Sequence, residues 1–253
     1  MIYHKKSKKF AMKVLNEYLF GAWAWFVFVI VVLGMILCFP FTSKVRTTRL
    51  IAKKGVRLIL KVLRYKIIVK GYENLIKSPS ILVVNHASYI DPIVLSAVLP
   101  PQYAYVGKRE LKHVPFLGYI VRKVGTHLVD RFNAVKGAQD IRRIMSSGQG
   151  LDSIIFFPEG TFYAEDGLGK FKLGAFLTAV KNDIPVIPIA MNGTRQLLRS
   201  EIWLPSKVPL KITIFPPIYP DEVENGAQGI SEKSRSLMLS EINEPDLKEK
   251  SYP

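Results

Sequence analysis

The uncharged stretch Tyr18–Phe41 limits what this chain can fold into more than any other feature. A run of this length can cross a bilayer as a helix, and Trp23 and Trp25 lie near one end, where aromatic side chains favour the membrane interface. The run is too long for the apolar part of a signal peptide, and no small-residue cleavage site is found around Cys38. A buried core helix is a weaker alternative, because no polar residue marks an exposed face. We therefore expect residues 1–65 to anchor the chain in a membrane.

Basic residues crowd both sides of the apolar stretch. More of them follow it than precede it, so the positive-inside tendency places the rest of the chain on the cytoplasmic face, of the inner or plasma membrane in a bacterium. Basic charge on both sides also allows a helical hairpin that enters and leaves one leaflet, with Pro40 at its bend. The spanning and re-entrant arrangements both stay open. The basic residues are Lys5, Lys6, Lys8, Lys9 and Lys13 before the stretch, and Lys44, Arg46, Arg49, Lys53, Lys54, Arg57, Lys61 and Arg64 after it.

The segment Ser43–Arg64 mixes apolar residues with these cations, which predicts a basic amphipathic helix. Such a helix fits an anionic membrane surface. It equally fits a helix packed on the domain with a solvated basic face.

The net charge of +16 is compatible with nucleic acid, but no nucleic-acid-binding motif is present, so we expect membrane lipids as the partner. The single cysteine, Cys38, excludes an internal disulfide and a cysteine metal cluster.

Residues 66–224 alternate short apolar runs with helical stretches, which predicts an α/β domain with helices covering a mixed, largely parallel sheet. Functional sites of such sheets gather at the carboxyl ends of the strands. Residues 225–253 form a polar and charged C-terminal tail, and we expect it to be loose from Glu244 onward. The expected strands are Lys66–Val69, Ile81–Val84, Tyr103–Val106, His127–Val129, Ser153–Phe157, Val186–Met191 and Leu210–Phe215. The expected helices are Pro92–Val98, Phe116–Val124, Ala134–Ser146 and Leu173–Lys181.

The stretch Ile81–Pro92 is the strongest candidate for the chemistry. Its four apolar residues favour a buried strand, and Asp91-Pro92 is typical of a helix start, with Asp91 as N-cap. His86 and Asp91 are five apart, so they would not face each other on one helix or one strand. They can meet across a strand–turn–helix junction, where the carboxylate would make the imidazole a general base near neutral pH. On spacing alone, a loop histidine and a capping aspartate are the favoured interpretation, because histidine and aspartate often occur near each other.

Further blocks make the catalytic interpretation stronger, because they occur in a fixed order from Lys66 to Phe215. The chain resembles the 1-acylglycerol-3-phosphate acyltransferases, the glycerolipid acyltransferases with a His-x4-Asp block. The matching blocks are Asn85–Asp91, Val106–Leu111 with Pro115–Gly118, Gly125–Arg131, Phe157–Thr161 and Val186–Ile189.

The resemblance implies acyl transfer from a thioester to a lysolipid hydroxyl. His86 would take the proton of the attacking hydroxyl, and Asp91 would orient the imidazole. Ser88 more plausibly braces the turn than acts as a nucleophile. The thioester carbonyl becomes an oxyanion that needs hydrogen-bond donors, and backbone N–H groups near Asn85 or Gly160 are candidates.

The expected substrate-binding residues include two cations and one short block. Lys108 and Arg131 are natural phosphate ligands by charge and in part by resemblance, although each could be a solvated residue at a strand end. Glu159, Gly160 and Thr161 would line the acceptor pocket, with the carboxylate on a glycerol hydroxyl. A plain turn after the preceding proline is the alternative for Glu159.

One departure from the family pattern concerns the acceptor. Phe162 and Tyr163 follow Thr161, where the family usually has an arginine that contacts the acceptor phosphate. We therefore expect a membrane-bound acyltransferase that uses acyl-CoA or acyl carrier protein and a lysophospholipid, with 1-acylglycerol-3-phosphate as the leading acceptor. The alternatives are a different lysophospholipid or another lipid acceptor, a hydrolase, and a non-catalytic acyl-lipid-binding membrane protein.

No metal and no cofactor is expected, because the other histidines lack paired ligands at metal spacing; these are His4, His113 and His127.

Overall fold

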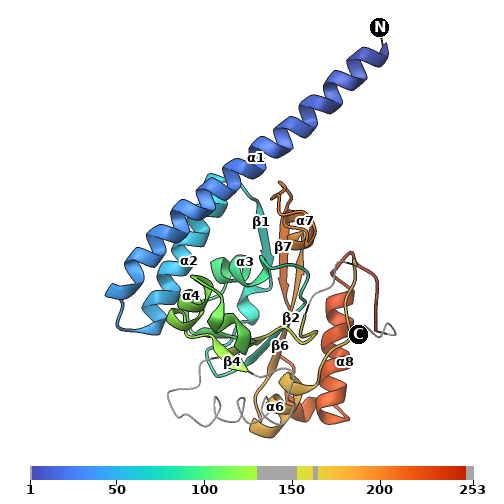
Figure 1. Cartoon of the computed structure of the whole chain (residues 1–253). Helices are drawn as coiled ribbons and strands as arrows, with labels where there is room; N and C mark the ends of the chain where they lie inside the picture. The colour runs from blue at the N-terminus through green and yellow to red at the C-terminus, as the bar shows by residue number, and fades with distance from the viewer. Residues whose placement is uncertain (1, 130–152, 162–164, 249–253) are drawn as a thin grey trace.

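A seven-stranded sheet forms the centre of the molecule, with the strand order β1-β7-β6-β2-β5-β3-β4 (Figure 1). The computed structural model describes residues 2–129, 153–161 and 165–248, with the side chains of residues 2–10 left out. Among the described strands, β6 and β7 pair antiparallel and every other pair is parallel. This confirms the mixed, largely parallel sheet. The strands are β1 Ile67–Lys70, β2 Ile81–Val84, β3 Tyr103–Lys108, β4 His127–Val129, β5 Ser153–Phe156, β6 Val186–Asn192 and β7 Leu210–Ile214.

Helices cover both faces of the sheet and create two separate hydrophobic cores (Figure 1). Side chains alternate along β2, so Leu82 and Val84 pack with α2 and α3 while Ile81 and Val83 pack with α6 and α8. All four side chains are fully buried. The continuous apolar runs of the sequence are thus explained by burial on two sides. The helices of this layer structure are α2 Val45–Val62, α3 Asp91–Val98, α4 Leu117–Lys123, α6 Gly174–Asn182, α7 Thr194–Leu197 and α8 Gly226–Leu239; the short 3-10 turns are Phe39–Phe41, Tyr72–Asn74, Arg109–His113 and Pro220–Glu222.

The apolar stretch of the sequence lies in one long helix, α1 Ile2–Cys38, whose N-terminal part projects away from the rest of the molecule (Figure 1). Within the described residues, this is the helix that is long and apolar enough to cross a membrane, with a mean hydropathy of 2.7 over its most apolar window. Only 17% of that window is buried. A core helix would be mostly buried, so the core-helix alternative does not describe α1.

The second half of α1 packs antiparallel on α2. Ala24 and Val27 of α1 are buried against Ile59 and Leu63 near the end of α2. Further along α1, a Cβ atom added to Gly55 of α2 would lie 2.3 Å from the Met35 sulfur. The glycine therefore lets the two helices approach closely at this level.

Three basic residues of α2 are fixed to the domain rather than free for lipid. Buried Lys53 donates to the carbonyl oxygens of Val98 and Leu99 at 3.0 and 2.9 Å, at the end of α3. Arg57 Nε donates to Ala97 O at 2.8 Å. Arg49 donates to carbonyl oxygens of three loop residues; these are Val124, Pro101 and Gly125. Cations at a helix C-terminus are favoured by the helix dipole, so this side of α2 supports the packed-helix alternative.

Two expectations differ from the structure or lie outside it. The polar tail expected from residue 225 begins with the packed helix α8, in which Ile230 and Met238 are fully buried. The segment after α8 also packs, because Leu247 is only 5% exposed. The few apolar residues of α8 lie on one face of the helix. The overall polarity of the segment therefore did not indicate that it would pack. The expected helix Ala134–Ser146 lies outside the described residues.

Candidate active site

The stretch after β2 forms the predicted strand–turn–helix junction and brings His86 to Asp91. His86 Nδ1 lies 2.8 Å from Asp91 Oδ2. The same oxygen accepts the backbone N–H groups of Ala87 and Ser88 at 2.7 and 2.9 Å. Asp91 is therefore not the N-cap of α3, as expected, but its first residue. Its carboxylate closes the preceding turn instead of capping the helix, because the turn N–H groups are within its reach.

The imidazole of His86 is held by a carboxylate on one side and a ring on another. Asp91 is fully buried, and its Oδ2 is placed to accept a hydrogen bond from Nδ1–H. In the neutral tautomer that donates this bond, Nε2 is the unprotonated nitrogen. The ring of Phe157 stacks on His86 with the centroids 4.4 Å apart. The His86 side chain is 15% exposed and lines a cavity of about 800 Å³. This arrangement places the imidazole at the wall of that cavity.

Two polar side chains fix the turn to neighbouring elements. Asn85 makes a paired contact with the backbone of Met191 in β6, accepting at 2.7 Å and donating at 3.0 Å. Ser88 Oγ donates to Leu198 O at 2.7 Å, which agrees with its expected bracing role. Asn85 is buried and its amide is committed to β6, so a direct contact with substrate stays a prediction.

Glu159 lies beneath His86 rather than facing an open pocket. Its Oε1 accepts the backbone N–H of His86 at 2.6 Å, and its Oε2 accepts the N–H of Gly169 at 2.8 Å. Glu159 is 3% exposed, and burial raises its pKa to about 7, although the two N–H donors and Arg195 act in the opposite direction. The expected contact with a glycerol hydroxyl finds no support here, because both carboxylate oxygens are already engaged with backbone.

The other expected substrate-binding residues fall into two groups. Lys108, Gly160 and Thr161 line the same cavity as His86. Lys108 ends β3 and the Glu159 block follows β5, its neighbour in the sheet, so the carboxyl ends of the strands converge as expected. Arg131 lies outside the described residues, as do Phe162 and Tyr163.

The candidate oxyanion donors are largely committed to other acceptors. The N–H of Gly160 donates to Phe157 O at 3.0 Å. The N–H groups of His86, Ala87 and Ser88 all donate to carboxylates. These backbone N–H groups are therefore engaged with acceptors of the protein itself.

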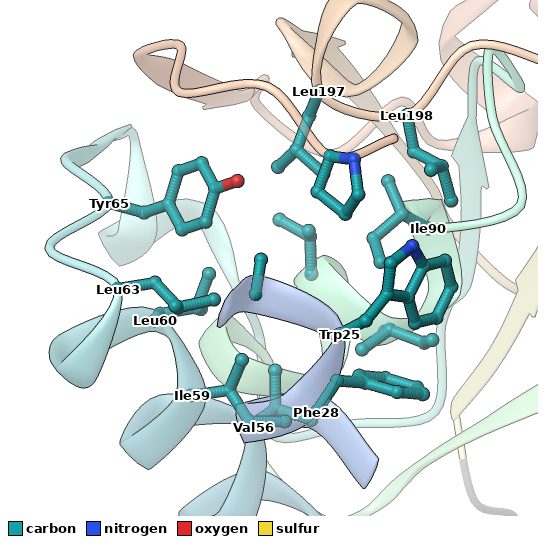
Figure 2. A pocket seen from close by; sticks show the side chains of 14 residues that line it. Trp25, Phe28, Val56, Ile59, Leu60, Leu63, Tyr65, Ile90, Leu197 and Leu198 are labelled. Carbon is teal, nitrogen blue, oxygen red and sulfur yellow. The ribbon is translucent and has the colours of Figure 1, made fainter. Parts of the chain in front are cut away.

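The cavity that His86 faces has a volume of about 800 Å³ and mostly apolar walls. Its walls come from the second half of α1, from α2, from the start of α3 and from the segment around α4. A second cavity of about 50 Å³ lies beside it between α1, α2 and the segment after α7 (Figure 2). The two cavities share Phe28, Val56, Ile59 and Ile93 as lining residues. Ligand pockets are typically roughly 300–1,000 Å³ and mainly apolar, so the larger cavity can accept an extended apolar group with its end at His86.

Comparison with known proteins agrees with this site. A family model described as Acyltransferase matches residues 66–192, half of the chain, which include His86, Asp91 and Glu159. The chain belongs to this acyltransferase family. The match begins at the end of the α1–α2 pair and reaches the last residue of β6, so it covers the strands that carry the site.

Similar proteins include several named for one activity. The 1-acyl-sn-glycerol-3-phosphate acyltransferase of Escherichia coli is 30% identical over 171 residues, which cover 66% of this chain and 68% of that protein. The enzyme of the same name from Saccharomyces cerevisiae is 29% identical over 180 residues, 70% of this chain and 59% of that protein. The chain thus spans less than two thirds of the yeast relative.

A solved structure shares the fold. The crystal structure of the 1-acyl-sn-glycerophosphate (LPA) acyltransferase PlsC from Thermotoga maritima superposes with a TM-score of 0.73 and 20% identity, covering 89% of this chain and 94% of that one. The agreement extends well beyond residues 66–192, so it includes part of the N-terminal helices.

The sequence analysis assigned no role to two residues of the site. Phe157, which stacks on His86, is the first residue of the block Phe157–Thr161, and its place in that block could have identified it. Arg195 influences the Glu159 carboxylate from α7, and no local signal marks it. Only the three-dimensional path of the chain brings it close.

Proposed function

We propose that this chain is a membrane-bound acyltransferase that moves a fatty acyl group from acyl-CoA or acyl carrier protein to the free hydroxyl of 1-acylglycerol-3-phosphate, in phospholipid synthesis. The observation that carries the proposal is the His86–Asp91 pair at 2.8 Å opening onto an apolar cavity of about 800 Å³. The names of the relatives support the acceptor. A protein that only holds acyl lipid would need no such pair.

The proposed reaction is a direct transfer with His86 as general base. Nε2 takes the hydroxyl proton while the hydroxyl oxygen bonds to the thioester carbonyl carbon. The carbon–sulfur bond then breaks, and the imidazolium returns the proton to the leaving sulfur. Asp91 stabilises the imidazolium and fixes its tautomer. No covalent enzyme intermediate is required, because the hydroxyl attacks the thioester itself.

The cavity supports an acyl-lipid substrate more than a small polar one. Its walls include apolar side chains of α1 and α2 that lie far along the sequence from the His86 turn, such as Phe28, Val32 and Ile36. Burying a methylene group contributes about 0.8 kcal/mol, so a long acyl chain gains much of its binding from this region. The reacting carbonyl would then lie at the polar end, beside His86.

The position of the helices supports insertion into one leaflet rather than a complete span. α1 packs antiparallel on α2, and Arg49, Lys53 and Arg57 fix α2 to the domain. A full span by the second half of α1 would therefore draw α2 and the domain into the hydrocarbon layer. From Tyr18 onward the outward side of α1 is apolar, which suits lipid contact; exposed residues there include Leu19, Trp23, Phe26, Ile30, Leu33 and Leu37.

The decisive experiment is mass spectrometry of the products formed from one labelled acyl thioester and a panel of lysolipids. We expect the label in phosphatidate when lysophosphatidate is present. Label appearing mainly as free fatty acid would identify a hydrolase. Label appearing mainly in another lipid would identify a different acceptor, and no release of thiol with any acceptor would contradict the proposed activity.

The acceptor phosphate is expected to matter less than in relatives with an arginine after the Glu-Gly-Thr block. Lys108 and Arg131 are the proposed phosphate ligands, and more than one cation holds a phosphate monoester best. Phe162→Arg should therefore lower KM for lysophosphatidate and leave a neutral acceptor unchanged or worse. The check is the ratio of kcat/KM for the two acceptors in both proteins. An unchanged ratio would mean that position 162 does not face the head group.

A further inference from the structure

The Glu159 carboxylate that supports His86 is itself supported from behind. Its second oxygen accepts the N–H of Gly169 at 2.8 Å. Gly169 ends the short segment Gly167–Gly169, which we call the bracing segment. This segment is held on its far side by two buried arginines, Arg195 of α7 and Arg235 of α8, and by the C-terminal residues Glu244–Leu247.

Arg195 joins the bracing segment to the C-terminal residues through a two-point ion pair. Its Nε donates to Glu244 Oε1 at 2.9 Å and its Nη2 donates to Glu244 Oε2 at 3.0 Å. The same Oε2 accepts the N–H of Gly167 at 3.0 Å. Bidentate pairs of this kind fix geometry as well as adding energy. The two side chains are 7% and 14% exposed, so water screens the pair only weakly.

Arg235 and a short backbone pairing hold the middle of the bracing segment. Arg235 donates to Leu168 O at 2.8 Å and also to Gly169 O and Asp246. Leu168 pairs with the C-terminal residues through its N–H to Pro245 O at 2.9 Å and its O to Leu247 N at 3.0 Å. A Cβ on Gly167, whose φ is +147°, would lie 2.4 Å from Leu247. The bracing segment therefore has little freedom to move.

We propose that Arg195 and Glu244 are positioning residues for His86, acting through the bracing segment and Glu159. The connection is continuous: the ion pair fixes Gly167, the segment presents the Gly169 N–H, and Glu159 bridges that N–H to the N–H of His86. This inference rests on the proposed function, because it concerns how the proposed general base is held. It assigns a role in the site to residues near the C-terminus that the motif blocks do not include.

The connection also has an electrostatic part. Glu159 must be ionised for both oxygens to accept N–H groups. Burial raises its pKa to about 7; the N–H groups of His86 and Gly169 oppose this most, Asp91 raises it further, and Arg195 lowers it. The charged or titratable groups near it are His86, Asp91, Arg195 and Lys172, and both Glu244 and Asp166 partly neutralise Arg195. Removing the Arg195 cation raises this pKa, so the ionised fraction falls at a given pH. Removing the Glu244 charge lowers it.

The test compares Arg195→Gln with Glu244→Gln in the full-length protein. We expect kcat with an acyl thioester and lysophosphatidate to fall roughly 10- to 100-fold in Arg195→Gln, as a small misplacement of a reacting group would cause, with KM changed little. The acid limb of its pH–rate profile should move to higher pH. In Glu244→Gln the acid limb should move to lower pH. If the two residues had a purely structural role, the acid limb would shift in the same direction in both variants or would not shift. Either result would overturn the inference.

A matched control is Lys211→Gln. Its ion pair with Glu241, at 2.6 Å, joins β7 to the turn after α8, and within the described residues it has no hydrogen bond to the bracing segment. We expect a wild-type acid limb in this variant. The same loss and shift as in Arg195→Gln would overturn the inference.

A chemical readout separates the inference from the proposed function. The rate at which diethyl pyrocarbonate modifies His86, measured by peptide mass spectrometry over a range of pH, needs no turnover. We expect its pH dependence to shift in opposite directions in Arg195→Gln and Glu244→Gln, even if the wild type proves inactive on lysophosphatidate. Arg195→Lys, which keeps the cation, should recover most of the wild-type profile if Arg195→Gln folds poorly. Unchanged modification profiles in all three variants would overturn the inference.

Discussion

His86 uses one ring nitrogen, Nδ1, to contact Asp91, and its side chain lines the cavity. The proposed general base requires such a contact, because the carboxylate determines which nitrogen carries the proton. Asp91 is fully buried and uses a single oxygen for three contacts, while its Oδ1 has no hydrogen-bond partner among the described residues. All the hydrogen bonds of the Asp91 carboxylate are therefore made by the oxygen that contacts the imidazole.

Substitutions at this pair give the first prediction. His86→Ala should lower kcat by roughly 10²–10⁴-fold, the usual contribution of a general base, while thermal unfolding and membrane association stay close to wild type. Asp91→Asn should lose activity of a similar order, because an amide cannot accept all three contacts as a carboxylate does. Purified proteins assayed for thiol release provide the check. Near wild-type turnover in His86→Ala would refute the mechanism.

The sequence alone could identify the His86–Asp91 pair because both residues lie in one short turn. It could not identify what Glu159 does. The bond from Glu159 to the His86 backbone joins residues 73 apart, and its partner Gly169 follows an undescribed stretch. A carboxylate that follows one strand can face a ligand or the backbone that follows the neighbouring strand. Only the three-dimensional arrangement of the two strands determines which of these contacts it makes.

At the level of elements, burial patterns made the sheet predictable. All seven strands occur where apolar runs predicted them, with ends that differ by at most two residues. Helix α8 was missed because its amphipathic face is narrow, and because buried Ser234 and Arg235 make its buried side polar in sequence. Arg235 can be buried because the carbonyl oxygens of the bracing segment and the carboxylate of Asp246 accept its hydrogen bonds, and no local pattern records these tertiary contacts.

The close approach of α1 and α2 gives a prediction at this scale. Gly55→Leu should force the helices apart at Met35 and lower the free energy of unfolding by about 1–3 kcal/mol, as overpacking usually does. Gly34→Ala is the matched control, because a Cβ there has no atom within 4 Å and alanine favours a helix by about 1 kcal/mol. Thermal unfolding in the same detergent compares them. Equal stabilities of the two variants would contradict the observed packing.

For the whole molecule, the apolar outward side of α1 predicts membrane attachment that salt cannot reverse. The full-length protein should sediment with membranes in about 1 M salt, which screens surface charges within about 3 Å. Removal of residues 1–42 should leave weaker binding that salt abolishes, carried by exposed cations of α2 such as Lys54 and Lys61. Flotation assays at low and high salt measure both proteins. Complete release of the full-length protein by salt would contradict an embedded helix.

The cavity walls include the second half of α1, the same helix whose other side faces outward. A lipid that reaches His86 along this helix would arrive from within a two-dimensional phase, so its supply depends on its mole fraction in the surface and not on its concentration in the surrounding water. Diluting lysophosphatidate in mixed micelles with an inert detergent, at constant bulk concentration, should therefore slow the reaction. If the rate did not change on this surface dilution, the acceptor would enter from solution.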